Sequence, residues 1–173
     1  SRVSGFAFFV FKKQVQAILL SYREIVVTLE VGQKKKGRGS MKKQYETAMI
    51  NRGGRVGEVE APNGSFHLKI DKPGLHSEGT NPEQLFAAGY ASCFNGAVQH
   101  MLKEHNIESE SEVKARVSLY QHEDGSYQIG VILEVSLPGV EKAEAEKIAE
   151  EAHDFCPYSR ATRGNIDVEV QVV

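Results

Sequence analysis

This 173-residue sequence contains two cysteines, Cys93 and Cys156, whose side chains can act both as nucleophiles and in redox reactions. A cysteine thiolate is a nucleophile, and its sulfenic acid condenses with a second thiol to form a disulfide. Cys93 lies in an apolar segment rich in Gly and Ala, where a cysteine can equally be a small core residue. Cys156 precedes Pro157, at a predicted helix end whose backbone can move. From the residues alone, a reactive pair, core residues and a structural disulfide all stay open.

A reactive cysteine needs nearby positive charge to lower its pKa. Two arginines are candidates: Arg55 in Gly-Gly-Arg-Val-Gly, and Arg163 in Thr-Arg-Gly-Asn. The glycines allow a tight turn that could aim a guanidinium inward, and a buried arginine needs an acidic partner. Glu83, in the first turn of the helix that carries Cys93, is the natural partner. Glu83 and Cys93 do not share a helix face, so Arg55 would have to bridge them from another element.

Several other function classes are not supported by the sequence. The six histidines show no zinc-type spacing, no Gly-x-Ser-x-Gly motif marks a hydrolase, and the glycine run at 53–57 lacks the P-loop ending. Residues 1–40 carry an excess of positive charge, so the small net charge of -2 leaves residues 41–173 acidic. An acidic body argues against nucleic acid as a partner. No apolar run approaches the ~18 residues of a membrane span, and two cysteines fit a reducing, cytoplasmic setting.

A basic, Gly-rich stretch at 33–40 resembles a linker and divides the chain. Met41 follows it as a natural start, so residues 1–40 are expected to be a leader or tag-like segment and 41–173 the functional domain. The alternative is a genuine extension, in which 15–20 and 25–29 form a short helix and strand that dock on the domain.

Hydrophobic periodicity over 41–173 predicts strands, a helix, a hairpin, a second helix and a last strand, which together indicate an α+β domain. The first helix should start at Asn81-Pro82 or through a Thr80–Glu83 capping box, and reach about His105. The second, at 141–155, should bury Val140, Ile148, Ala152 and Phe155 and end at Pro157. The predicted strands are 45–50, 55–60, 65–71, 113–121, 127–137 and 166–173, and Leu119 is expected on the buried face of the hairpin.

Several motifs together resemble one family, the organic hydroperoxide resistance proteins of the osmotically inducible protein C superfamily. They are Asn-Pro-Glu-Gln-Leu-Phe-Ala-Ala-Gly-Tyr at 81–90, Ser-Cys-Phe at 92–94, Cys-Pro-Tyr-Ser at 156–159, Ala-Thr-Arg-Gly-Asn at 161–165 and the glycine-flanked arginine at 53–57. They occur in the family's order across 41–173. One departure is Arg160, where many members carry Asn, beside the second cysteine.

The resemblance implies a cysteine-based peroxidase that reduces alkyl and fatty-acid hydroperoxides in oxidative-stress defence. By this likeness Cys93 is the peroxidatic cysteine, Cys156 the resolving cysteine, Arg55 the residue that activates the thiolate, and Glu83 the carboxylate that orients Arg55. Neither a metal nor a bound cofactor is implied. An external dithiol, typically dihydrolipoyl groups on lipoylated proteins, would reduce the disulfide.

The resemblance also implies the fold and the assembly. Antiparallel sheets are expected to pack around two main helices in an intertwined homodimer, with both active sites at the subunit interface. Phe86, Phe94 and Tyr158 would give an apolar pocket suited to organic peroxides, although each of these aromatic residues can equally belong to the core.

Overall fold

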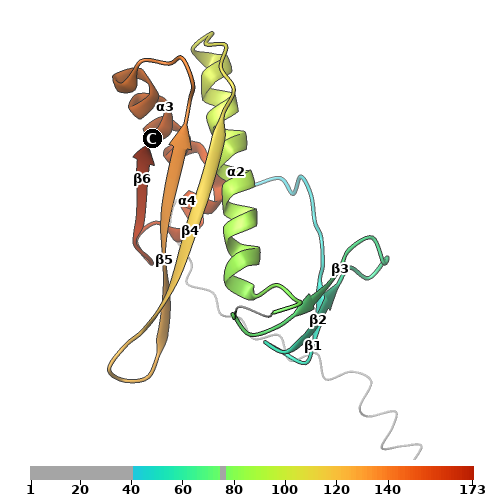
Figure 1. The fold of residues 1–173 in the computed structure, drawn as a ribbon. Coiled ribbons are helices and arrows are strands. Elements are labelled where there is room, and N and C mark those ends of the chain that lie inside the picture. Colours follow the sequence, from blue (N-terminus) through green and yellow to red (C-terminus); the bar gives the residue numbers. More distant parts are fainter. Residues whose placement is uncertain (1–40, 75–76) are drawn as a thin grey trace, which may run out of the picture. The chain divides into compact units, whose positions relative to one another are not determined.

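The computed structural model describes residues 41–74 and 77–173, and within them Thr47–Val173 form one compact unit. The predicted leader at 1–40, with its alternative helix and strand, lies outside the described residues. Two three-stranded sheets and three helices make up the unit (Figure 1). In chain order they are β1 (Ile50–Arg52), β2 (Gly57–Glu60), β3 (His67–Ile70), α2 (Pro82–Glu104), β4 (Glu112–Gln121), β5 (Tyr127–Ser136), α3 (Lys142–Phe155), α4 (Pro157–Thr162) and β6 (Val168–Val172).

The first sheet is antiparallel, in the order β1-β2-β3. β2 and β3 lie inside their predicted ranges and are shorter than predicted. The prediction of a strand at 45–50 was wrong for all but Ile50, where β1 starts. Arg55 in particular lies in the turn between β1 and β2 and not within a strand, because Gly53 and Gly54 have positive φ angles of 85° and 65°. Glycine adopts such angles without steric cost, so the chain reverses immediately before the arginine.

Helix α2 starts where the sequence predicted. Asn81 is its N-cap, and the side-chain Oδ1 accepts a hydrogen bond of 2.9 Å from the N–H of Gln84. Pro82 occupies the first helical position, where its missing N–H costs no hydrogen bond. The alternative capping box is not formed, since the Thr80 hydroxyl donates to the Gln84 side chain. The helix ends at Glu104, one residue from the predicted limit.

The second sheet has the order β4-β5-β6. β4 and β5 form the predicted antiparallel hairpin, with Val113 opposite Val135 and Leu119 opposite Ile129. β6 pairs with β5 in parallel, which corrects the expectation of purely antiparallel sheets. The parallel pairing follows from the connection: α3 and α4 carry the chain back before it enters the sheet edge.

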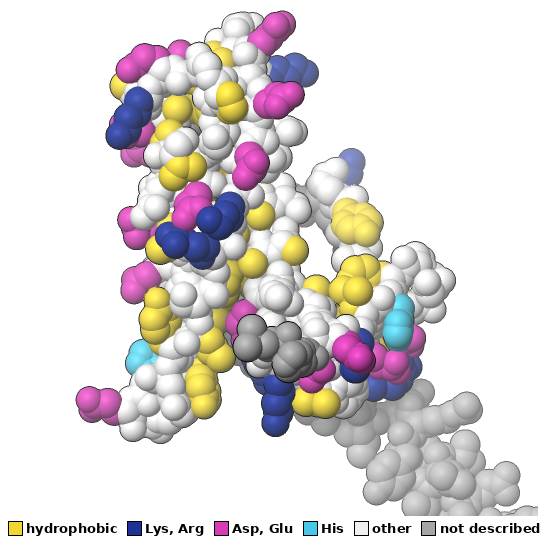
Figure 2. Space-filling view, viewed as in Figure 1, with side chains coloured by type: hydrophobic (Ala, Val, Ile, Leu, Met, Phe, Trp, Pro, Cys, Tyr) yellow, Lys and Arg dark blue, Asp and Glu magenta, His cyan; other side chains and the backbone are white. Residues whose placement is uncertain are grey.

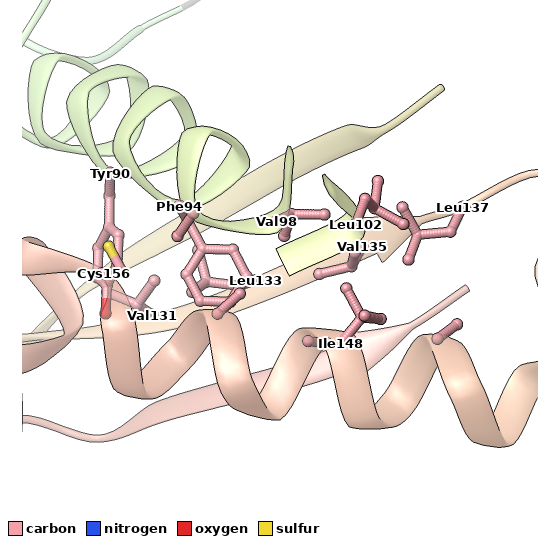
Figure 3. Close-up of a cluster of buried hydrophobic side chains, with 14 residues drawn as sticks. Tyr90, Phe94, Val98, Leu102, Val131, Leu133, Val135, Leu137, Ile148 and Cys156 are labelled. Carbon is pink, nitrogen blue, oxygen red and sulfur yellow. The ribbon is translucent and has the colours of Figure 1, made fainter. Parts of the chain in front are cut away.

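The core lies between α2, α3 and the inner face of β4-β5-β6 (Figure 3). Its largest fully buried side chains include Tyr90 and Phe94 from α2, Leu133 from β5 and Ile148 from α3. The prediction that Phe155 is buried was wrong: its side chain is 49% exposed and stacks on His100 with ring centroids 4.5 Å apart. Leu119 is likewise exposed, because the buried face of the hairpin ends before the turn.

Pro157 ends α3 as predicted and also starts a further helix, α4, that the sequence analysis did not anticipate. Cys156 is the single residue between the two helices and serves as C-cap of one and N-cap of the other. In the described ranges, no helix has both the length and the apolar character that a membrane crossing requires.

Candidate active site

The structure brings the two cysteine sulfurs together. Cys93 comes from the middle of α2 and Cys156 from the α3–α4 junction, and their Sγ atoms are 3.6 Å apart. Both are free thiols. A disulfide bond is about 2.0 Å long, so the sulfurs must approach by only about 1.6 Å to form one. The pair is therefore in contact as two thiols and close to the geometry of a covalent link.

The two thiols differ in access. Cys156 has no exposed surface, whereas Cys93 is partly exposed. The backbone of Cys156 is held on both sides: its N–H donates to the carbonyl of Ala152 at 2.8 Å, and its own carbonyl accepts from the N–H of Arg160 at 3.0 Å. A small molecule can therefore reach Cys93 first, and Cys156 lies behind it on a fixed support.

The surroundings of Cys93 act on its pKa in opposite directions. Burial is the largest influence and raises the pKa of the thiol, because a thiolate loses solvation inside the protein. A backbone hydrogen bond from Tyr158 lowers it, and the neighbouring Cys156 raises it. Within one chain, then, Cys93 has a thiol pKa above the ordinary value, and a further positive charge is needed to make it a thiolate at neutral pH.

Arg55 and Glu83 form the ion pair that the sequence suggested. Nη2 of Arg55 lies 2.8 and 2.7 Å from the two carboxylate oxygens of Glu83. The Glu83 side chain is 16% exposed and that of Arg55 is 54% exposed. Hydrogen bonding from Arg55 lowers the pKa of Glu83, so the carboxylate stays charged at neutral pH. Among the described residues, Nε and Nη1 of Arg55 donate to no protein acceptor, which leaves these two nitrogens free to donate to a ligand.

The ion pair and the cysteine pair are separate within this chain. Glu83 and Cys93 are ten residues apart on α2, which corresponds to about 15 Å along a helix axis. The other candidate cation, Arg163, donates to Asp154 at 2.7 Å and to the carbonyl of His153 at 3.1 Å. Neither arginine bonds to a sulfur in the part of the chain that the structure describes. Those residues also hold no cluster of three or more His, Cys, Asp or Glu side chains suited to a metal ion.

The three candidate pocket aromatics divide into two groups. Phe86 and Tyr158 lie side by side with ring centroids 6.3 Å apart, and Tyr158 is 40% exposed. Phe94 is fully buried in the core cluster, so it contributes to packing and not to an open pocket wall. Tyr158 also lies against Gly89, where an added Cβ would be 3.1 Å from its hydroxyl. Gly89, which has no side chain, therefore lies at the point where the Tyr158 ring of α4 meets α2.

Sequence reasoning missed a buried group of hydroxyls next to the cysteines. Tyr90 on α2 contacts Ser159 and Thr162 on α4, and all three are buried. The only sequence signal for them is the i, i+3 spacing of Ser159 and Thr162 directly after Cys-Pro, which is too common to identify a tyrosine partner so distant in the chain.

Comparison with known proteins places the chain in a family. Residues 74–171 match the model described as OsmC-like protein. The chain is 48% identical over 132 residues to the organic hydroperoxide resistance protein OhrB of Bacillus subtilis, an alignment that covers 74% of this chain and 97% of the relative. OhrA of Bacillus subtilis is 44% identical over 126 residues, covering 69% and 89% of the two chains.

Solved structures agree with this placement. The crystal structure of OhrB of Bacillus subtilis superimposes with a TM-score of 0.71 at 44% identity, covering 75% of this chain and 98% of that one. An organic hydroperoxide resistance protein from Elizabethkingia anophelis, solved with thiocyanate bound, gives a TM-score of 0.71 at 40% identity over 76% and 98% of the two chains. The motifs, the fold and these relatives together show that the chain belongs to the organic hydroperoxide resistance proteins of the OsmC family.

Proposed function

We propose that this protein is a thiol peroxidase that reduces organic hydroperoxides to alcohols in defence against oxidative stress, with Cys93 as the attacking residue and Cys156 as the resolving one. The observation that carries the proposal is the 3.6 Å separation of the two sulfurs, one partly exposed and one buried. The names of the relatives, organic hydroperoxide resistance proteins, support the substrate class.

The proposed reaction has two steps on the protein. The Cys93 thiolate attacks the distal oxygen of the hydroperoxide, the O–O bond breaks, and the alkoxide leaves and takes a proton to become the alcohol. Cys93 is then a sulfenic acid. The Cys156 thiol attacks that sulfur, the S–O bond breaks, and water leaves as the disulfide forms. An external dithiol returns both cysteines to thiols and is itself oxidised to a disulfide.

Arg55 and Glu83 supply the charge that this first step needs. We assign Glu83 to orient Arg55, and Arg55 to stabilise the Cys93 thiolate and the departing alkoxide through its free donors. The separation of about 15 Å along α2 keeps this pair away from the cysteines of its own chain. The charge is therefore better supplied by a second copy of the chain. In such a dimer, the Arg55–Glu83 pair of one chain completes the cysteine site of the other.

The proposed homodimer accords with the exposed apolar side chains. Figure 2 shows hydrophobic side chains along the β4–β5 hairpin and over the β1–β3 sheet. Leu119, Tyr120 and Tyr127 are between 45% and 63% exposed on the hairpin. Exposed apolar residues gathered in this way are typical of surfaces that another chain covers.

Mixing two inactive variants tests the shared site. Cys93→Ser and Arg55→Ala chains are unfolded together, refolded and assayed with cumene hydroperoxide. If Arg55 acts across the interface, each mixed dimer contains one intact site, and activity returns to roughly a quarter of wild type. If Arg55 acts within its own chain, no mixed dimer has an intact site, and activity stays absent. Refolding each variant alone gives the baseline.

Phe86 and Tyr158 are proposed to line the substrate pocket, which would favour an alkyl or fatty-acid hydroperoxide over hydrogen peroxide. The reductant is proposed to be a dihydrolipoyl group on a lipoylated protein, and a reducing, cytoplasmic setting would keep both thiols available. Competition between cumene hydroperoxide and hydrogen peroxide tests the pocket. Turnover with dihydrolipoamide, against the same concentration of reduced thioredoxin, tests the reductant.

Turnover is the decisive experiment for the function as a whole. The protein is incubated with cumene hydroperoxide and excess dithiol, and peroxide loss is followed for many equivalents. We expect continued consumption, and none with Cys93→Ser. Consumption that stops at about one equivalent per chain, with dithiol still in excess, would show a thiol that reports oxidation and not an enzyme.

A further inference from the structure

Three buried hydroxyls connect the helices that carry the two cysteines. The Tyr90 hydroxyl of α2 donates to Oγ of Ser159 at 3.0 Å and lies 3.2 Å from Oγ1 of Thr162, both on α4. Tyr90 and Ser159 have no exposed surface and Thr162 is 9% exposed. Because buried hydroxyls have no water to replace a lost partner, these contacts fix the helices relative to each other.

Tyr90 is the member that crosses between the helices. The Thr162 hydroxyl also reaches the carbonyls of Tyr158 at 3.0 Å and Ser159 at 3.1 Å, which belong to its own helix. Its hydrogen bonding is therefore satisfied within α4. Ser159, in contrast, receives its hydrogen bond from Tyr90. Removal of the phenol oxygen would leave the polar side of α4 facing an apolar ring, with no bond to α2 at that point.

The hydroxyl group and the sulfur pair span the same two segments. Tyr90 is three residues before Cys93 on α2, so the two side chains lie on one helix face. Ser159 is three residues after Cys156, and the Arg160 N–H bond to the Cys156 carbonyl closes that turn. Tyr90 and Cys156 belong to the same buried cluster, and both are labelled in Figure 3. A shift of α4 at Ser159 would therefore move the Cys156 sulfur relative to Cys93.

We propose that Tyr90 is a positioning residue for the resolution step, acting through Ser159 to hold the Cys156 sulfur against Cys93. This inference rests on the proposed function. Its chemical meaning is a competition for the Cys93 sulfenic acid. Attack by the Cys156 thiol releases water and gives the disulfide, whereas attack on a second hydroperoxide gives the sulfinic acid and an alcohol. A well-placed Cys156 makes the first path faster.

Tyr90→Phe tests the inference, with Tyr45→Phe as the matched control, since Tyr45 is 81% exposed and precedes the compact unit in the chain. Reduced protein is mixed with increasing cumene hydroperoxide, and timed samples are analysed by whole-protein mass spectrometry for sulfenic acid, disulfide and sulfinic acid. For Tyr90→Phe we expect disulfide formation to slow by about tenfold or more, because a displacement near 1 Å can cost up to a hundredfold in rate. The first oxidation should stay within about twofold of wild type, and the sulfinic fraction should rise with peroxide concentration.

Three results would overturn the inference. They are an unchanged rate of disulfide formation in Tyr90→Phe, an equal change in Tyr45→Phe, and a first oxidation slowed as much as resolution. Ser159→Ala removes the acceptor with little loss of volume. This variant should also form the disulfide more slowly and accumulate more sulfinic acid. If Tyr90→Phe does not fold, the rates of Ser159→Ala decide. Wild type that forms no Cys93–Cys156 disulfide would instead refute the proposed function, so the two failures are distinct.

Discussion

Glu83→Gln separates the structural from the functional importance of the Arg55–Glu83 ion pair. The substitution keeps the shape of the side chain and removes the charge that both short contacts, 2.7 and 2.8 Å, depend on. Because the Arg55 side chain is 54% exposed, solvent screens the pair, and the free energy of unfolding should fall by less than about 1 kcal/mol. The cost to stability is thus small.

The cost to activity should be larger. An arginine released from its partner regains rotamer freedom worth up to about 2 kcal/mol. Ordering that side chain again in the transition state raises the activation free energy by the same amount. That corresponds to a fall of about thirtyfold in kcat/KM for cumene hydroperoxide. Glu60→Gln is the matched control, since Glu60 pairs with Arg52 on the neighbouring strands of the same sheet and lies outside the proposed site.

Peroxide consumption and urea unfolding of both variants provide the test. Equal kcat/KM for Glu83→Gln and wild type would refute the orienting role. A loss of several kcal/mol in Glu83→Gln would show that the pair supports the fold and not the chemistry. The pH dependence adds a check: Arg55 lowers the pKa of Glu83, so the pair's contribution should be complete above the ordinary glutamate pKa and disappear as pH falls through the lowered one.

Arg55→Ala should leave Cys93 with a pKa above that of an ordinary thiol, because burial within the chain raises it. Ultraviolet titration of the thiolate should give a lower Cys93 pKa in wild type than in this variant. Identical titrations would remove Arg55 from the site. Cys156→Ser should permit one oxidation of Cys93 and then accumulate sulfinic acid, seen by mass spectrometry, whereas behaviour identical to Cys93→Ser would reverse the two assignments. Gly89→Ala places a Cβ 3.1 Å from the Tyr158 hydroxyl, but that half-exposed ring can shift and alanine favours the helix. The free energy of unfolding should therefore change by less than about 1 kcal/mol. A larger loss in urea titration would show that the ring cannot move.

Local signals in the sequence predicted most of the fold. The Asn81-Pro82 start of α2 and the β4–β5 hairpin were confirmed, because caps and alternation are properties of neighbouring residues. The exposure of Phe155 and the parallel pairing of β6 were not predictable in this way. Both depend on which segments meet in three dimensions, and periodicity does not carry that information.

In the candidate site too, features set by neighbouring residues were predictable, and contacts between distant segments were not. Glycines around Arg55 and a carboxylate in the first turn of α2 were sufficient to suggest an ion pair, and the structure contains it. The hydroxyl contact between Tyr90 and Ser159 joins residues 69 positions apart and has no local signature. The assignment of chemical roles to Cys93 and Cys156 came from the family resemblance, since spacing alone does not distinguish a nucleophile from a core thiol.

The positions of the two cysteines along the chain also bear on the lifetime of the protein. They are 63 residues apart, and a disulfide that closes a loop of that length stabilises the folded state by about 4 kcal/mol through the entropy of the unfolded chain. If turnover proceeds as proposed, each cycle alternates between a protein with two free thiols and no cross-link and a protein cross-linked by the disulfide. A chain whose Cys93 has become sulfinic acid can no longer enter the cross-linked state. Proteases that act on unfolded chains would therefore remove inactivated molecules faster than the molecules that rest as the disulfide.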